Sequence, residues 1–347
     1  GDVYKRQDFT NLNAYVLKWS IVGDNGKMLA KGEQSIEVAP HATTEVSLGG
    51  VRLPWNIREA YLNLSWTPKK KSAFIGTDDE VAYDQFVLPA NSQYRPTLAK
   101  LSEKPEIQID PKTGALTSYI YEGQEYLASP VRLSLYRPAT DNDNREKKGG
   151  AKVWRKLGLN HLVQRVLSVK TSGHTTYSEV KLLNDKNDTI GSATFEYTIR
   201  KDGILSVQTR FVPDTTFVSS LARVGLVFEM PHSFNRVTYL GRGEHETYAD
   251  RKLSGRIGIY HTDAERMFHY YVRPQATGNR TDVRWMQVSD ELEKGLSVWG
   301  EKPFEFSVSP FTDENIDAAG HINELKRNGT VTVHLDALQS GVGTATC

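Results

Sequence analysis

The stretch KDGILSVQTRFV, residues 201–212, contains the pattern that decides the fold. Its Asp-Gly pair tolerates the positive φ angles that a two-residue hairpin turn requires. The residues after the turn are rich in Val, Ile and Phe, and part of the run alternates apolar with polar side chains. A turn signal that leads into such a run predicts a β-strand in an antiparallel hairpin.

The same pattern recurs along the chain. Turn signals at residues 24–26 (Asp-Asn-Gly) and 327–329 (Arg-Asn-Gly) punctuate further runs. Helical periodicity is nearly absent, although residues 153–162 suggest a helical turn or two. The spacing of short strands therefore predicts an all-β protein built of β-sandwiches. Strands are expected at residues 14–22, 35–38, 44–46, 59–66, 81–88, 131–136, 204–212 and 331–335.

The chain length bounds the number of domains. The sequence has 347 residues, and a typical domain has about 150, so two domains are expected. A polar segment that ends in proline, residues 91–96, has the composition of a linker. The part before this segment has the size of one small sandwich. The part after it shows no comparable break and is expected to form one large β domain.

The composition excludes several classes of partner. Lys and Arg total 43 and Asp and Glu total 42, so the net charge is +1. Neither nucleic acid nor an anionic membrane is expected as the main partner of such a chain. The one cysteine, Cys347, excludes a disulfide framework and a cysteine-based zinc cluster. No apolar run approaches the ~20 residues of a membrane-spanning helix.

The densest polar segment is residues 137–145, Arg-Pro-Ala-Thr-Asp-Asn-Asp-Asn-Arg. Because Asp and Asn favour tight turns, a structural loop is one interpretation. Alternating carboxylates and amides also suit calcium, although the twelve-residue spacing of an EF-hand loop is missing. The same groups accept hydrogen bonds from sugar hydroxyls. Composition alone does not separate these alternatives.

Two further segments concentrate polar groups. In residues 241–252, His245 stands between two glutamates, which would raise its proton affinity if the side chains are close. An exposed, polar strand end is the alternative. In residues 271–285, arginines, amides and an indole could bind sugar oxygens and stack on a pyranose, or could pair with one another. The candidates in this second segment are Arg273, Gln275, Asn279, Arg280 and Trp285.

Signatures of catalysis are missing from the sequence. There is no Gly-x-Ser-x-Gly elbow, no Walker loop and no His-Glu-x-x-His. The histidines show no metal-ligand spacing, so no metal site is expected. A glycosidase needs two carboxyl groups about 5–9 Å apart, and no such pair stands out in the sequence. The residues alone therefore nominate no catalytic pair.

Taken together, these segments resemble the C-terminal part of the large multidomain β-galactosidases of bacteria, which belong to glycoside hydrolase family 2. Residues 137–145 are similar to the signature Arg-Pro-x-Thr-Asp-Asn-Asp of that family. Residues 241–252 are similar to its signature Gly-x-Gly-Pro-x-Glu-x-Tyr-x-Asp-Arg. Residues 271–285 resemble Arg-Pro-Gln-Glu-x-Gly-Asn-Arg-Thr-Asp-Val-Arg-Trp. Three positions depart from these patterns, namely Glu244, Thr247 and Ala276, and the further matching segments are residues 8–12, 82–86 and 335–347.

The resemblance implies the limits of the domains. Residues 1–7 do not match the family and resemble a translated sequencing adaptor, so they are expected to be a non-native scar. Residues 8–92 are expected to form an immunoglobulin-like β-sandwich. Residues 93–347 are expected to form a large antiparallel β-supersandwich of the galactose mutarotase-like type, truncated at its C-terminus.

The resemblance also implies a function for the parent protein. The parent would be a retaining glycosidase that hydrolyses terminal β-D-galactosides, with its catalytic glutamates in a barrel that precedes residue 1. Mg²⁺ or Na⁺ would bind in that barrel, and no cofactor is expected in this chain. The chain would cap the barrel and be inactive alone. Its loop carried over to the rim of the sugar site is Asp141, Asn142, Asp143, Asn144 and Arg145.

The expected partners are the β-galactoside and the parent's catalytic barrel. A homo-oligomer stays open, and the parent would reside in the cytoplasm or periplasm of a bacterium. Two alternatives come from other classes of protein. A stand-alone carbohydrate-binding module would bind galactose without turnover, and a mutarotase-like epimerase would need a His and a Glu that converge in a cleft.

Overall fold

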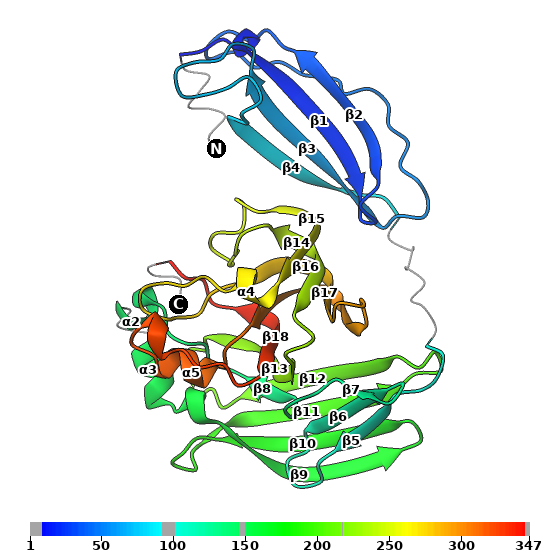
Figure 1. The fold of residues 1–347 in the computed structure, drawn as a ribbon, viewed down its shortest axis with the longest axis vertical. Coiled ribbons are helices and arrows are strands. Elements are labelled where there is room, and N and C mark those ends of the chain that lie inside the picture. Colours follow the sequence, from blue (N-terminus) through cyan, green and yellow to red (C-terminus); the bar gives the residue numbers. More distant parts are fainter. Residues whose placement is uncertain (1–8, 92–100, 146–149, 217, 344–347) are drawn as a thin grey trace. The chain divides into compact units, whose positions relative to one another are not determined.

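The structure is a computed structural model, and it confirms the predicted all-β class with several antiparallel sheets (Figure 1). The expected scar at residues 1–7 and the last residues of the expected truncated end lie outside the described part of the chain. So does the expected domain boundary between residues 92 and 93. The described residues are 9–91, 101–145, 150–216 and 218–343.

The chain folds into two compact units. The first comprises Gly1–Thr97 together with Ile257–Ile259, and the second comprises Leu98–Arg256 together with Tyr260–Cys347. No helix in the described residues has the length and apolar character that crossing a membrane requires.

The first unit is built on a four-stranded antiparallel sheet with the order β2-β1-β3-β4. Trp19 of β1 faces Gly32 of β2, where a Cβ atom would lie 2.7 Å from the indole ring. The small core contains Ile21, Ile57 and Ala60. The strand expected at residues 44–46 is not formed, since this segment is irregular. The elements are η1 (Leu12–Ala14), β1 (Tyr15–Gly23), β2 (Met28–Ser35), β3 (Glu59–Pro68) and β4 (Ala82–Pro89).

The second unit contains three sheets. A three-stranded sheet has the order β5-β6-β7, and a four-stranded sheet has the order β12-β11-β10-β9. The largest sheet has seven strands in the order β15-β14-β16-β17-β18-β13-β8. The strands of the two smaller sheets are β5 (Glu106–Ile109), β6 (Leu116–Tyr121), β7 (Gln124–Glu125), β9 (Val163–Ser172), β10 (Thr175–Leu183), β11 (Thr189–Ile199) and β12 (Leu205–Pro213). Those of the largest are β8 (Arg132–Ser134), β13 (Arg223–Pro231), β14 (Arg236–Gly243), β15 (Arg256–Asp263), β16 (Arg280–Ser289), β17 (Gly295–Ser309) and β18 (Thr330–Gln339).

The core of the second unit is shared by its sheets. On β11, Ala193, Phe195 and Tyr197 are buried while the intervening side chains are not, because successive residues of a strand point to opposite faces. They belong to one hydrophobic cluster with Phe228 of β13 and Val333 of β18. Burial of such side chains contributes about 25 cal/mol per Å² of apolar surface, so this cluster is the main source of the unit's stability.

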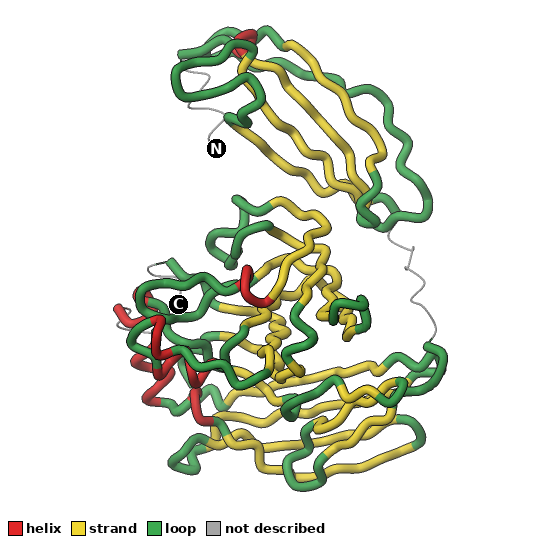
Figure 2. The backbone as a smooth tube through the Cα atoms, viewed as in Figure 1, coloured by secondary structure: helices red, strands yellow, loops and turns green. Residues whose placement is uncertain are grey.

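Short helices gather beside one end of the largest sheet (Figure 2). Arg155 of α3 links two of them, because its guanidinium donates to Asn144 Oδ1 of α2 at 3.0 Å and to Asp317 Oδ1 of α5 at 3.0 Å. The helical elements are α2 (Asp141–Arg145), α3 (Ala151–Lys156), η2 (Leu159–His161), α4 (Ala264–Met267), α5 (Asp313–Ala318) and η3 (Ile322–Glu324).

Candidate functional site

The polar segment at residues 137–145 is organised around a buried ion pair. Arg137 is fully buried and Asp143 is 2% exposed. The guanidinium donates twice to the carboxylate, from Nη2 to Oδ1 at 2.8 Å and from Nε to Oδ2 at 3.2 Å. This two-pronged geometry is the strong form of an arginine–carboxylate contact. The pair fixes the base of the loop.

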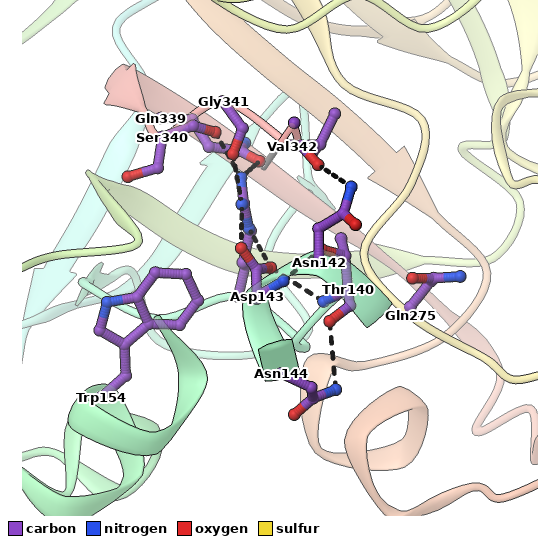
Figure 3. A network of polar contacts seen from close by, with 12 residues as sticks. Thr140, Asn142, Asp143, Asn144, Trp154, Gln275, Gln339, Ser340, Gly341 and Val342 are labelled. Carbon is purple, nitrogen blue, oxygen red and sulfur yellow. Dashed lines mark hydrogen bonds and ion pairs between the residues drawn. The ribbon is translucent and has the colours of Figure 1, made fainter. Parts of the chain in front are cut away.

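Arg137 also holds the end of the described chain. Its Nη1 donates to Gln339 Oε1 at 3.2 Å and to the carbonyl of Ser340, and its Nη2 donates to the carbonyl of Gly341 at 2.7 Å. The guanidinium carbon lies 5.6 Å from the centre of the Trp154 ring. Figure 3 shows residues 339–342 converging on the loop. One buried cation therefore joins two segments about 200 positions apart.

Reciprocal hydrogen bonds explain why α2 is helical. The Thr140 amide donates to Asp143 Oδ2 at 2.8 Å, and the Asp143 amide donates to Thr140 Oγ1 at 3.2 Å. This is the arrangement of a capping box, in which a Ser or Thr and an acidic or amide residue three positions later satisfy each other's amides. The sequence predicted a polar loop here, and the structure resolves it into a short capped helix.

The rest of the 141–145 loop presents polar groups outward. Asp141, Asn144 and Arg145 are exposed. Asn142 is partly buried and donates from Nδ2 to the Val342 carbonyl at 2.7 Å. Asn144 Nδ2 donates to the Thr140 carbonyl at 3.1 Å. The loop therefore has a buried anchor in Asp143 and an exposed polar surface.

The segment at residues 271–285 lies against this loop. The Asp141 amide donates to Gln275 Oε1 at 2.9 Å, and the Ala276 amide donates to the Pro138 carbonyl at 3.1 Å. Gln275 is partly buried, and Arg273, which precedes it in the sequence, is exposed. Gln275 therefore belongs with the 141–145 loop, whereas no hydrogen bond or ion pair among the described residues joins Arg273 to it.

Two other candidates from that segment lie in the interior. Asn279 is 1% exposed and Arg280 is 3% exposed. Arg280 Nε donates to Tyr239 Oη at 2.9 Å, and its Nη1 donates to the carbonyl of Gly278 at 3.0 Å. Trp285 is in β16, where it pairs with Leu240 of β14 and Trp299 of β17. Among the described residues, no hydrogen bond or ion pair joins Trp285 to the 141–145 loop.

Glu246 anchors the segment at residues 241–252. It accepts from Tyr271 Oη at 2.9 Å, from Thr277 Oγ1 at 2.7 Å and from the Gly278 amide at 2.9 Å. Burial raises the pKa of this carboxyl, but these hydrogen bonds outweigh burial and the net pKa is lowered. His245 points elsewhere, with its Nε2 2.8 Å from Ser254 Oγ.

Asp250 completes the convergence. Its carboxylate accepts from the Val342 amide at 3.2 Å and from the Gly343 amide at 2.6 Å. The three segments that the sequence singled out are therefore linked to one another by hydrogen bonds, either directly or through the end of the described chain. We call the set of residues 137–145, 246–250, 273–280 and 339–343 the loop cluster.

Beneath the loop cluster lies a buried carboxyl with an unusual pKa. Glu305 is 8% exposed, and its Oε2 accepts from Asn279 Nδ2 at 2.6 Å. Burial raises the pKa of Glu305 to about 7, with a further rise from the nearby carboxyl of Asp336 and an opposing effect of the Asn279 hydrogen bond. Asn279 Oδ1 in turn accepts from Gln339 Nε2 at 3.3 Å, so this carboxyl is linked to the loop cluster.

Sequence reasoning overlooked several of these residues. Arg137 stood within a recognised segment, but its central role depends on Gln339, Ser340 and Gly341, which are remote in the sequence. Glu305 carried no local signal at all, since it lies within a strand of mixed composition. No group of three or more His, Cys, Asp or Glu side chains within the described residues is arranged to hold a metal ion.

The fold and the loop cluster together define the class of protein. It is an all-β protein with a large antiparallel unit, whose polar loops converge beside its short helices. Residues 102–347 match the profile of the β-galactosidase small chain, and residues 2–89 match β-galactosidase domain 4. The chain belongs to the β-galactosidase family.

Proteins similar to this chain are β-galactosidases. A β-galactosidase of Priestia megaterium is 31% identical over 359 residues, which cover 98% of this chain and 34% of that protein. A β-galactosidase of Actinobacillus pleuropneumoniae is 24% identical over 368 residues, covering 99% of this chain and 35% of that protein. The chain thus spans about a third of the length of these relatives.

Proposed function

We propose that the chain is the C-terminal part of a retaining β-galactosidase of glycoside hydrolase family 2, which hydrolyses terminal β-D-galactosides. In this proposal the chain covers the catalytic barrel of the parent and supplies loops to the rim of its sugar site. The observation that carries the proposal is the loop cluster, because Arg137, the cation of a buried ion pair, also holds a segment about 200 positions away. Such an anchor gives the exposed side chains a fixed geometry.

The exposed members of the loop cluster would contact the sugar. Asp141 and Asn144 offer acceptors to sugar hydroxyls, and Arg145 and Arg273 offer donors. Asn142 and Gln275 are partly buried and would support them. The buried candidates Asp143, Asn279 and Arg280 would act by positioning the loops. The general acid and the nucleophile would be glutamates of the barrel.

A chimera tests this role. The matching C-terminal third of the Priestia β-galactosidase would be replaced by residues 8–347, and hydrolysis of a nitrophenyl β-galactoside measured. We expect activity from the chimera and none from the relative truncated at the same point. Asp141→Ala in the chimera should raise KM about threefold to tenfold through loss of one hydrogen bond to the sugar.

Asp185→Ala is the matched control, since Asp185 is exposed on the turn between β10 and β11. It should leave KM unchanged. A folded chimera without activity, or equal KM values for the two variants and the unmodified chimera, would contradict the proposed role.

A further inference from the structure

The sequence contains two Asn-Gly pairs. Asn25 and Gly26 lie in the turn between β1 and β2, and Asn328 and Gly329 lie directly before β18. All four residues are exposed. An asparagine followed by glycine is especially prone to spontaneous deamidation, because glycine has no Cβ atom that would hinder attack by its own amide nitrogen. By local sequence, the two pairs are therefore expected to react at similar rates.

Deamidation joins the asparagine side chain to the next backbone nitrogen. The amide nitrogen of the glycine attacks Cγ of the asparagine, and its proton passes through solvent to the side-chain nitrogen, which leaves as ammonia. Water then opens the resulting succinimide at one of its two carbonyls and yields aspartate or isoaspartate. Water is the one co-reactant, and nothing is oxidised or reduced. A glycine amide that already donates a hydrogen bond must first break that bond.

The glycine amide of the first pair is held in its hairpin. The Gly26 amide donates to the Gly23 carbonyl at 2.9 Å, and the Gly23 amide donates to the Lys27 carbonyl at 2.9 Å. Asn25 Oδ1 accepts from the Lys27 amide at 3.0 Å. Attack on Asn25 therefore requires local opening of the turn, which lowers the reactivity of this pair.

The glycine amide of the second pair has no such bond. Among the described residues, the Gly329 amide donates no hydrogen bond, although its carbonyl accepts from the His232 amide at 3.0 Å. A Cβ atom at Gly329 would meet nothing within 4 Å, so there is space for a succinimide ring. The φ angles of Gly26 and Gly329 are +76° and +79°. The two glycines thus differ in the hydrogen bonding of their amides and hardly in φ.

The Asn328 side chain is held by two other side chains. Its Nδ2 donates to Glu229 Oε2 at 2.8 Å, and its Oδ1 accepts from Thr330 Oγ1 at 2.7 Å. Both contacts are exposed, so water readily replaces them when the side chain turns toward the Gly329 amide. The Thr330 hydroxyl also draws electron density from the Asn328 carbonyl, which makes Cγ a better electrophile.

We propose that Asn328 is a site of self-modification, which converts to aspartate or isoaspartate while the β1–β2 hairpin preserves Asn25. The product places a carboxylate where Asn328 Nδ2 now donates to Glu229 of β13. Two carboxylates then face each other, and a hydrogen bond is replaced by repulsion. This site uses no residue of the loop cluster and does not rest on the proposed function.

Peptide mapping by mass spectrometry of the full 347-residue chain tests the proposal, because it measures both pairs in one sample. The chain would be incubated at mildly alkaline pH, once folded and once in urea. In urea the two pairs should deamidate at similar rates, because the hairpin is open. In the folded chain we expect Asn328 to deamidate about tenfold faster than Asn25, which must first break the hydrogen bonds of its turn.

Three outcomes would overturn the proposed site. They are equal rates at the two pairs of the folded chain, a faster rate at Asn25, and no product at Asn328 after a time that suffices in urea. A pair that reacts at the same rate folded and unfolded would show that the hydrogen bonds of the turn do not control the reaction.

A variant with the product's charge tests the predicted repulsion. Asn328→Asp should accelerate hydrogen exchange of the His232 amide, which donates to the Gly329 carbonyl, about fivefold. Asn25→Asp makes the same change in the other turn and should leave this rate unchanged. Equal exchange of the His232 amide in the two variants would overturn the predicted effect of the modification.

Discussion

At the scale of single residues, Arg137 has the largest structural role in the loop cluster. Its guanidinium contacts Asp143, the side chain of Gln339 and two backbone carbonyls, all in the interior. A buried pair of this kind gains little net stability over an apolar pair, but breaking it strands a charge without a partner. Breaking the pair therefore destabilises the fold by more than its formation stabilises it.

Removal of the Asp143 carboxylate tests this point. Asp143→Ala should lower the free energy of unfolding by about 3–5 kcal/mol, because Arg137 would stay buried without its counter-charge. Urea denaturation followed by circular dichroism measures the change. The matched control is Asp141→Ala two positions away, which is exposed and should change stability by less than about 0.5 kcal/mol. Equal effects of the two variants would argue against the ion pair as an anchor.

Glu305 predicts a pH dependence of stability. Burial raises its pKa in the folded state to about 7 from an ordinary value of 4.5. Its contribution to stability is therefore fully present below pH 4.5, where both states hold the proton, and is lost as the pH rises through about 7. Glu305→Gln lacks this titration. The unfolding free energy of the native chain minus that of Glu305→Gln should fall with rising pH, by on the order of 3 kcal/mol.

Chemical denaturation at a series of pH values between 4 and 8 measures this difference. The difference between the two chains cancels the contributions that the other carboxyl groups make to the pH dependence of stability. Glu246 is one of them, and its lowered pKa gives the opposite trend. A difference that stays constant with pH would show that Glu305 titrates normally.

At the scale of elements, Glu246 connects two loops. Its carboxylate accepts from Tyr271, Thr277 and the Gly278 amide, which all belong to the segment before β16. Gly278 has a φ of +81°, and a Cβ atom there would lie 2.6 Å from the Met267 carbonyl oxygen. The glycine and the carboxylate together fix the path of the segment that carries Arg273 and Gln275.

Substitution of Glu246 should loosen that segment. Glu246→Gln removes the negative charge that strengthens three hydrogen bonds, so hydrogen exchange of the Gly278 amide should accelerate about tenfold, equivalent to about 1.4 kcal/mol. Glu244→Gln, at an exposed neighbour, is the control and should not change that rate. Exchange at Gly278 that is unaffected by Glu246→Gln would contradict the anchoring role.

At the scale of the whole molecule, the sequence predicted the strands better than it predicted the surroundings of the polar candidate residues. The run at residues 204–212 corresponds to β12, and the run at residues 14–22 corresponds to β1, because alternation and turn signals are local. Residues 44–46 have the composition of a strand but pair with no neighbour in the described sheet.

The candidate residues also show that a local pattern does not predict contacts with distant parts of the chain. Residue type alone made Asn279 and Arg280 candidates for binding sugar oxygens, yet both are buried, since their partners Thr247, Glu305 and Tyr239 come from other elements. Local composition also predicted a loop at residues 141–145, whereas Thr140 and Asp143 cap a short helix there, and Arg137 ties its base to Gln339 and Gly341, about 200 positions away. Such contacts depend on the fold and are not visible in a single sequence.

The central claim is that this chain supplies the cover and rim loops of a β-galactosidase, whose catalytic glutamates belong to another part of the parent. Hydrolysis of a nitrophenyl β-galactoside by the pure, folded chain tests it most directly. The account predicts no turnover above that of buffer, because it assigns both catalytic carboxyls to another part of the parent. Sustained turnover by the pure chain, abolished by substitution of a carboxyl within residues 9–343, would contradict it.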